Sequence, residues 1–225
     1  MTMRLSIIVP MLNEAAGIVA TLGALAPLRA RGHEVIAVDG GSHDGTAALC
    51  RGRADRVVTA ARGRARQMNA GARLASGDVL VFLHADTILP AHADALVSEA
   101  LKLGAQWGRF DIRIAGRSRL FPLIAALMNL RSLLSGIATG DQAMFIRRDL
   151  FIDIGGFPVQ PLMEDIELSH RLRLLGRPAC LHERVVTSGR RWDANGVWRT
   201  TLLMWRLRWR YWRGTPVEEL AKAYP

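Results

Sequence analysis

Short runs of apolar residues alternate with longer segments of helical spacing through the first half of the chain. The runs at 5–9, 34–38 and 79–83 are almost wholly apolar, as in strands that are buried on both faces. Between the first two runs, apolar residues recur at helical spacing: Ile18, Leu22, Leu25 and Leu28. This spacing predicts one helix over 14–30, and the strand–helix–strand order predicts a parallel sheet.

The rest of the chain predicts further elements of both kinds. Residues 107–114 alternate polar and apolar side chains, which predicts a strand with one solvated face. The other expected strands are 56–59 and 143–146, and the other expected helices are a short one ending at 49 and then 65–76, 90–103, 120–134, 148–154 and 164–175. We therefore expect one α/β domain over 1–187, with helices flanking a mostly parallel sheet, and a helical extension over 188–225 packed on that domain.

The charge of the chain narrows the class of partner without fixing it. The 225 residues carry 30 Lys+Arg against 20 Asp+Glu, which gives a formal net charge of +10. Lys102 and Lys222 are the only lysines, so arginine dominates, and its guanidinium group favours bidentate contact with phosphate. A nucleic acid, an anionic membrane and a phosphorylated small molecule would each suit this charge.

Three further features indicate the compartment. Cys50 and Cys180 form no CxxC pair, so neither a disulfide framework nor a thiolate metal site is expected. The first residues show no signal-peptide pattern, and the apolar stretch 120–130 is too short to span a bilayer. We expect a cytoplasmic protein that is soluble or peripheral at the inner face of the membrane.

Two carboxylates directly follow predicted strands. Asp39 follows the second apolar run, and Asp86 ends a His-Ala-Asp tripeptide that begins at His84, after the third run. Ligands of open α/β sheets bind at the carboxyl ends of the strands. Asp39 could accept hydrogen bonds from a base or a ribose, and Asp86 could hold a cation such as Mg²⁺, which often takes one or two carboxylates plus substrate phosphates. The structural alternative for Asp86 is a cap on the helix 90–103.

The turns after the first two strands have structural explanations of their own. Pro10 fixes a turn, Asn13 can cap the following helix, and Glu14 in its first turn would complement the helix dipole. Ser42 or Asp44 is expected to cap the short helix after the second strand. Taken singly, each of these residues suits a structural role.

Charged residues stand at the starts of two predicted helices. Arg64 precedes 65–76 and could clamp a diphosphate, the alternative being a solvated face. Glu164 and Asp165 open the helix 164–175, where carboxylates ordinarily act as caps. In the functional alternative, Asp165 is a general base that deprotonates an attacking hydroxyl.

In their order and spacing, these positions resemble the family-2 glycosyltransferases with the GT-A fold. The resemblance spans residues 4–185 and rests on the segments 7–14, 38–46, 64–71, 84–86, 155–157 and 164–165. It implies a Rossmann-like sheet and an enzyme of the hexosyltransferase type. The implied reaction transfers a sugar from a nucleotide diphosphate sugar with inversion at the anomeric carbon.

The resemblance also implies roles for residues. Asp86 would hold Mn²⁺ or Mg²⁺ on the departing diphosphate, and Asp165 would be the base on the opposite face of the sugar. The nucleotide-sugar site would be lined by Pro10, Asn13, Glu14, Asp39, Arg64, His84 and Asp86. The tripeptide begins with His84 where the family more often has Asp, which leaves the metal role of Asp86 intact.

Two more segments resemble narrower groups within the family. Residues 140–145 and 190–192 look like a small bacterial subgroup associated with arsenosugar biosynthesis. Candidates for the acceptor side or the diphosphate are then Asp141, Gln142, Glu164, Arg191 and Trp192. The last two are similar to an Arg-Trp element of processive relatives, but the glutamine that precedes this element is missing here, with Ser188 nearby, so processive polymer synthesis is not expected.

The segment 197–213 carries two adjoining stripes at helical spacing. They consist of Arg199, Arg206, Arg210 and Arg213, and of Trp198, Trp205, Trp209 and Trp212. Such a helix can lie in a membrane interface; alternatively, the tryptophans pack on the domain and the arginines face water. A peripheral membrane contact, a lipid-linked acceptor and a homodimer through this helix all stay open.

The motifs of nucleic-acid-binding proteins, P-loop proteins and dehydrogenases are missing from the sequence. No zinc-finger, homeodomain or RNA-recognition signature accompanies the basic residues, so no nucleic-acid partner is expected. No P-loop occurs, and residues 10–14 cannot form the Gly-x-Gly-x-x-Gly turn of a dehydrogenase. The alternatives that remain are a sugar-phosphate nucleotidyltransferase and a non-catalytic membrane-surface module.

Overall fold

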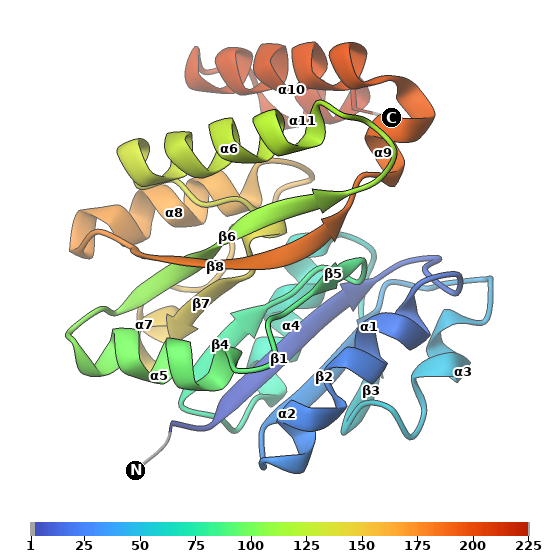
Figure 1. The fold of residues 1–225 in the computed structure, drawn as a ribbon, viewed down its shortest axis with the longest axis vertical. Helices are drawn as coiled ribbons and strands as arrows, with labels where there is room; N and C mark the ends of the chain where they lie inside the picture. Colours follow the sequence, from blue (N-terminus) through green and yellow to red (C-terminus); the bar gives the residue numbers. More distant parts are fainter. Residues whose placement is uncertain (1–2, 225) are drawn as a thin grey trace.

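The structure, a computed structural model, describes residues 3–224 and contains an eight-stranded sheet flanked by helices (Figure 1). The strands are β1 (Leu5–Met11), β2 (Glu34–Asp39), β3 (Arg56–Thr59), β4 (Val79–Phe82), β5 (Thr87–Ile88), β6 (Trp107–Ala115), β7 (Met144–Arg147) and β8 (Ala179–Ser188). Their order across the sheet is β3-β2-β1-β4-β7-β6-β8-β5. The first four strands in that order run parallel, and β7 is antiparallel to both of its neighbours. The predicted α/β class with a mostly parallel sheet is confirmed.

Helices cover both faces of the sheet. The helices of the domain are α1 (Ile18–Ala24), α2 (Ala26–Ala30), α3 (Thr46–Cys50), α4 (Arg64–Leu74), α5 (Ala93–Lys102), α6 (Phe121–Ser135), α7 (Arg148–Asp153) and α8 (Glu164–Leu175), with a 3-10 turn η1 (Gly140–Gln142). One hydrophobic cluster joins the sheet to α1, α2, α5 and α6, and a second joins the other face to α4, α7 and α8. Every residue of β1, β2 and β4 is buried, which explains their continuous apolar runs.

Two sequence predictions are wrong in detail. The single helix over 14–30 is instead α1 and α2, which meet at Leu25, and Pro27 lies in the first turn of α2. The solvated face expected along 107–114 holds only for the second half of β6. Arg109 in its first half is buried, because its guanidinium pairs with Asp111 and its Nε donates to Ser132 Oγ at 3.1 Å.

The C-terminal residues form three helices that continue from β8. These are α9 (Arg190–Asn195), α10 (Val197–Trp212) and α11 (Val217–Lys222). Leu207 of α10 and Leu220 of α11 pack with residues near the start of α8, among them Met163 and Ile166. The four tryptophans of α10 point away from this contact and are 58–77 % exposed, so the interpretation that packs them on the domain is wrong. No helix among residues 3–224 combines the length and hydrophobicity needed to cross a bilayer.

Candidate active site

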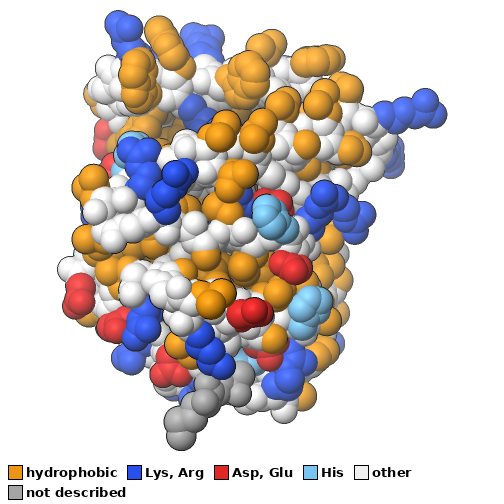
Figure 2. Space-filling view, turned by 60° about the vertical axis from the view of Figure 1, so that its left-hand side comes forward, with side chains coloured by type: hydrophobic (Ala, Val, Ile, Leu, Met, Phe, Trp, Pro, Cys, Tyr) orange, Lys and Arg blue, Asp and Glu red, His pale blue; other side chains and the backbone are white. Residues whose placement is uncertain are grey.

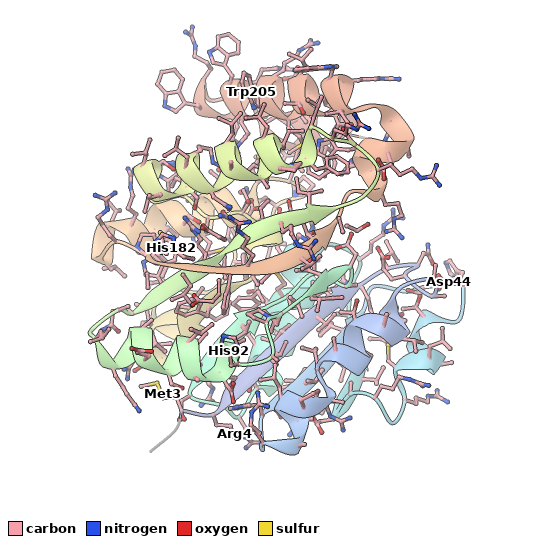
Figure 3. The ribbon with its side chains drawn as sticks, in the orientation of Figure 1. Met3, Arg4, Asp44, His92, His182 and Trp205 are labelled. Carbon is pink, nitrogen blue, oxygen red and sulfur yellow. The ribbon has the colours of Figure 1, made fainter. Side chains whose placement is uncertain are left out.

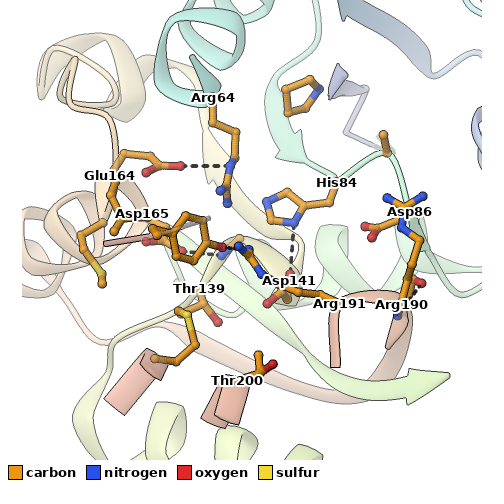
Figure 4. Close-up of a pocket in the computed structure, with 18 of the residues that line it drawn as sticks. Arg64, His84, Asp86, Thr139, Asp141, Glu164, Asp165, Arg190, Arg191 and Thr200 are labelled. Atoms are coloured by element: carbon orange, nitrogen blue, oxygen red, sulfur yellow. Dashed lines mark hydrogen bonds and ion pairs between the residues drawn. The ribbon is translucent and has the colours of Figure 1, made fainter. Parts of the chain in front are cut away.

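A cavity of about 880 Å³ opens at the carboxyl ends of β1 and β4 (Figure 4). It has the size of a small-molecule site. Its walls come from the loop after β1, the start of α4, the loop after β4, the residues before β7, the start of α8 and the C-terminal helices. Of the predicted site residues, the cavity is lined by Pro10, Glu14, Arg64, His84, Asp86, Asp141, Glu164, Asp165, Arg191 and Trp192. Segments far apart in sequence therefore meet where the carboxyl ends of parallel strands place ligands.

The two ring nitrogens of His84 differ: Nδ1 has a partner that fixes the ring, and Nε2 has none. Its Nδ1 lies 3.1 Å from Asp141 Oδ1, whereas its buried Nε2 has no hydrogen-bond partner among the described residues. Gly140 makes this orientation possible, because a Cβ at that position would lie 2.3 Å from Nε2. Burial acts to raise the pKa of Asp141, but the hydrogen bond from His84 and nearby cations lower it overall.

Asp86 presents the freest carboxylate in the cavity. No hydrogen bond joins its side chain to another residue in the described part of the chain, and α5 begins at Ala93, so the capping role considered for Asp86 is wrong. Beside it, Arg190 Nη2 binds both carboxylate oxygens of Glu14, at 3.1 and 3.0 Å. The hydrogen bond to Glu14 is the main cause of the raised pKa of Arg190, and the charge of Asp86 adds to it.

The residues around Asp86 fit a cation only if a substrate completes its coordination. Within residues 3–224, no three His, Cys, Asp or Glu side chains are grouped closely enough to hold an ion. Mg²⁺ commonly uses one or two protein carboxylates and takes its other ligands from water and phosphate oxygens. A single open carboxylate at the mouth of a cavity rich in arginine therefore matches a metal that arrives with a diphosphate.

Glu164 and Asp165 are neighbours with different surroundings. Glu164 is 3 % exposed, and Arg64 Nε lies 3.4 Å from its Oε1. Burial raises the pKa of Glu164, while the charge of Arg64 opposes that rise. Burial alone would lower the pKa of Arg64, but Glu164 and Asp165 raise it overall. This ion pair fixes the wall of the cavity.

Asp165 is held in place by main-chain donors. Its Oδ2 accepts from Gly140 N at 2.8 Å, and its Oδ1 accepts from Ile166 N at 2.8 Å. A carboxylate has about four acceptor positions, so Asp165 keeps the capacity to accept a proton or hydrogen bond from the cavity. The residue before the helix, Met163, has φ of 64° and is the N-cap, so neither carboxylate fills the capping position expected of it.

Three predicted site residues do not line the cavity. The carboxylate of Asp39 accepts from Gly41 N, Ser42 N and Ser42 Oγ within its own turn. Asn13 Oδ1 accepts from His43 N, so Asn13 braces the neighbouring loop and does not cap α1. Gln142 is fully buried, and its Oε1 accepts from Thr139 N beneath the loop that carries Asp141.

Several other lining residues, among them Tyr224, were not predicted to belong to the site; they lie beside the predicted Arg191 and Trp192. Tyr224 reaches the cavity, where the Arg191 guanidinium stacks on its ring at 3.8 Å and donates to its hydroxyl. Trp192 packs edge-on against Phe121, with ring centroids 6.1 Å apart. Apolar side chains of two helices complete the lining, Ile124 and Met128 of α6 and Met204 and Trp205 of α10, and α10 also contributes Thr200, Thr201 and Arg208. Their helical spacing in the sequence predicted helices but not a cavity.

Comparison with known proteins relates this arrangement to one family. The model of "Glycosyl transferase family 2" matches residues 6–155. Poly-beta-1,6-N-acetyl-D-glucosamine synthases of Staphylococcus aureus are 30 % identical over 183 residues. The match covers 73 % of this chain and 44 % of the synthase, so the chain spans less than half the length of these relatives.

Solved structures show the same fold. The mannosyltransferase PcManGT of Pyrobaculum calidifontis, in complex with GDP-Man and Mn²⁺, aligns with a TM-score of 0.62 at 24 % identity, covering 83 % of this chain and 57 % of its own. TarS of S. aureus, in complex with UDP-GlcNAc, aligns with a TM-score of 0.65 at 18 % identity, covering 83 % of this chain and 58 % of its own. At these identities the likeness establishes the fold.

Proposed function

The chain belongs to glycosyl transferase family 2, and on this premise we propose that it transfers a sugar from a nucleotide diphosphate sugar to an acceptor hydroxyl with inversion at the anomeric carbon. One observation carries the proposal: a single cavity presents the open carboxylate of Asp86 and the carboxylate of Asp165, anchored by main-chain N–H groups. The first suits a metal-bound diphosphate, and the second suits an acceptor hydroxyl. Similar structures that hold GDP-Man with Mn²⁺ and UDP-GlcNAc support this class of donor.

On the donor side, the basic residues of the cavity would bind the diphosphate. Arg64 is held by Glu164, and Arg190 is held by Glu14, so both guanidinium groups are oriented before the donor arrives. Asp39 has acceptor capacity beyond the bonds to its own turn and would bind the nucleoside. The remaining donor-side residues in this proposal are Pro10, Asn13, Glu14 and His84.

Asp86 would hold Mn²⁺ or Mg²⁺, which when bound neutralises charge on the departing diphosphate. The protein's own part at this point is to keep Asp86 unpaired and to keep Arg190 from folding onto it, which the pair with Glu14 achieves.

On the acceptor side, Asp165 would take the proton of the attacking hydroxyl. The hydroxyl oxygen bonds to the anomeric carbon, the bond from that carbon to the diphosphate oxygen breaks, and the nucleoside diphosphate leaves. The bonds from Gly140 N and Ile166 N fix the orientation of Asp165, which a general base needs in order to reach its proton. In this proposal 1–187 bind the donor and carry the base, and 188–225 supply part of the acceptor wall, with Asp141, Gln142, Glu164, Arg191 and Trp192 supporting the acceptor and the diphosphate.

A thermal-shift screen of UDP-, GDP- and dTDP-sugars, with and without Mn²⁺, tests the proposal. A ligand at about 100 times its Kd stabilises the folded state by about 2.7 kcal/mol, so a true donor is readily detected. We expect one nucleotide class to raise the Tm only with the metal present, and Asp86→Ala to abolish that rise. The matched control is Asp149→Ala, at the exposed start of α7.

The proposal is wrong if no nucleotide sugar raises the Tm under any metal condition. Release of pyrophosphate from a nucleoside triphosphate and a sugar phosphate would instead identify a nucleotidyltransferase. The resemblance to the arsenosugar-associated subgroup stays a prediction about the pathway.

A further inference from the structure

Two helices next to the cavity present apolar stripes to solvent. On α6 the outward stripe consists of Leu123, Leu127, Leu130 and Leu134, which are 50–69 % exposed. On α10 it consists of Trp198, Leu202, Trp205, Trp209 and Trp212. Trp205, labelled on α10 in Figure 3, is 63 % exposed, and Figure 2 shows hydrophobic side chains gathered over this end of the molecule. A monomeric soluble protein rarely exposes so many large apolar side chains together.

Arginine flanks the stripe of α10, and acidic residues are absent from both helices. Arg199, Arg206 and Arg213 flank the tryptophans along α10, and all three are exposed. Neither α6 nor α10 contains Asp or Glu. An exposed row of tryptophan beside a row of arginine is the composition of a helix that lies in the interface of an anionic membrane.

The same two helices form the apolar walls of the cavity. Ile124 and Met128 of α6 line it, as do Met204 and Trp205 of α10. Trp205 belongs both to the exposed stripe and to the lining. The apolar surface is therefore continuous with the wall of the cavity that contains Asp165.

We propose that the surface formed by the outward stripes of α6 and α10 binds an anionic lipid bilayer. Charge decides between this partner and a second copy of the chain. A symmetric dimer would place the same surface against itself, so the arginines of the two copies would face each other without an acidic partner on α6 or α10. An anionic bilayer supplies the missing negative charge and buries the tryptophans at its interface.

Binding in this orientation places the apolar wall of the cavity at the membrane. This inference about the acceptor rests on the proposed function. The acceptor would be a membrane lipid whose apolar part lies along α6 and α10 and whose hydroxyl lies at Asp165. This acceptor is amphiphilic, which matches a cavity with apolar walls at one side and charged residues at the other.

Vesicle sedimentation without any nucleotide sugar or metal tests the surface independently of turnover. We expect the wild-type protein to bind vesicles of phosphatidylcholine with phosphatidylglycerol, to bind pure phosphatidylcholine far less, and to lose binding at high salt. Each arginine near an anionic surface contributes about fivefold in affinity, so Arg199→Gln/Arg206→Gln/Arg213→Gln should weaken binding about 100-fold. Trp198→Ala/Trp209→Ala/Trp212→Ala should weaken it at least about tenfold.

Matched controls come from the opposite end of the molecule. Arg51→Gln/Arg73→Gln removes exposed charge, and Leu103→Ala/Ile152→Ala removes exposed apolar side chains, so neither should change vesicle binding. All variants alter exposed residues, and circular dichroism confirms that each is folded. The proposal is overturned if wild type does not bind anionic vesicles, or if the control variants lose binding as much as the variants of α10. A dimer in sedimentation velocity that the tryptophan variant dissociates, without vesicle binding, would assign the surface to a second copy.

Once the donor is known, vesicles of total membrane lipid and a labelled donor test the acceptor. Label recovered in the organic extract supports a lipid acceptor, and label confined to the aqueous phase overturns it. Donor binding in the thermal-shift screen is measured without vesicles, so failure of the proposed function is distinguishable from failure of the membrane surface.

Discussion

The amino ends and the carboxyl ends of the strands form two opposite edges of the sheet, and both edges carry carboxylates and a histidine. The two edges differ in whether these groups have hydrogen-bond partners within the protein. At the amino edge, Glu34 Oε2 accepts from Ser6 Oγ, Ser76 N and Ser76 Oγ. On the same edge, His33 Nδ1 accepts from Leu5 N and its Nε2 donates to Asp94, which also binds Arg31. Each of these buried carboxylates has its partners within the protein.

At the carboxyl edge, one carboxylate and one imidazole nitrogen are left open, although the other carboxylates there have partners. Asp86 has no hydrogen bond to a described residue, and His84 Nε2 is buried without one. An unsatisfied buried polar atom costs about 1–3 kcal/mol, so a stable fold retains few of them. The satisfied carboxylates of the amino edge therefore hold the sheet together, whereas the open carboxylate of Asp86 marks the place where a ligand would complete the structure.

The largest expected effect is on catalysis at the carboxyl edge. Asp165→Asn removes the proposed base but keeps an oxygen that can accept from Gly140 N, so turnover should fall about a thousandfold while the donor Kd is unchanged. Single-turnover kinetics and calorimetric titration measure the two quantities. Glu167→Gln, in the same turn of α8 but paired with Arg171, is the control and should keep its rate. A wild-type rate in Asp165→Asn would exclude this residue as the base.

At the amino edge the same substitution should act on stability and leave activity intact. Asp94→Asn removes the charge that binds Arg31 Nε and His33 Nε2, and Asp94 is only 7 % exposed. Hydrogen bonds to a charged group contribute about 1.5–3 kcal/mol, so the free energy of unfolding should fall by about 2 kcal/mol. Urea denaturation measures this, with Asp149→Asn as the exposed control. An unchanged midpoint would show that this edge does not stabilise the fold.

The stability difference should also depend on pH. Burial acts to raise the pKa of Asp94, but the hydrogen bonds from Arg31 and His33 lower it well below its ordinary value. A group with a lowered pKa contributes stability that is present above about pH 4 and is lost as the pH falls through the lowered pKa. Wild type and Asp94→Asn should therefore differ by a constant amount from pH 5 to pH 8 and converge below about pH 4, as urea midpoints at each pH would show. A difference that grows toward acid would reverse the assigned sign.

The smallest expected effect is on stability at the carboxyl edge. Asp86→Ala removes a carboxylate without a partner, so the free energy of unfolding should change by less than about 0.5 kcal/mol in the absence of ligand. Urea denaturation of the metal-free protein measures it. A loss above about 1 kcal/mol would show that Asp86 stabilises the fold and would remove the contrast between the two edges.

The sequence could predict the parts of the fold that are determined locally. The strands β1, β2 and β4 are buried on both faces, and their apolar runs indicate this directly. No local pattern indicates the strand β8, because much of it is exposed and carries His182, Glu183 and Arg184, and it forms through its pairing with the distant β6. The two residues of β5 pair only with β8, so no local pattern could predict them.

The sequence likewise predicted those site residues that lie at the ends of strands or the starts of helices, but not the contacts made by loops and distant segments. The end of an apolar run predicted Asp86 in the loop after a strand, and a helix start predicted Asp165 in the first turn of a helix; both residues line the cavity. The sequence could not show that Asp39 is engaged by its own turn and Asn13 by the neighbouring loop, because those bonds depend on loop geometry. Nor could it indicate Tyr224, which reaches the cavity only because α11 folds back onto α10.

The contact between His84 and Gly140 constrains how these two positions can evolve. A side chain at position 140 would overlap the imidazole ring, which Asp141 holds in place. Replacing His84 with a smaller residue would remove that constraint, whereas replacing Gly140 first would displace the ring. The two positions are therefore expected to covary among related sequences, with glycine at 140 wherever histidine stands at 84, and the change at 84 must come first in any lineage that loses both.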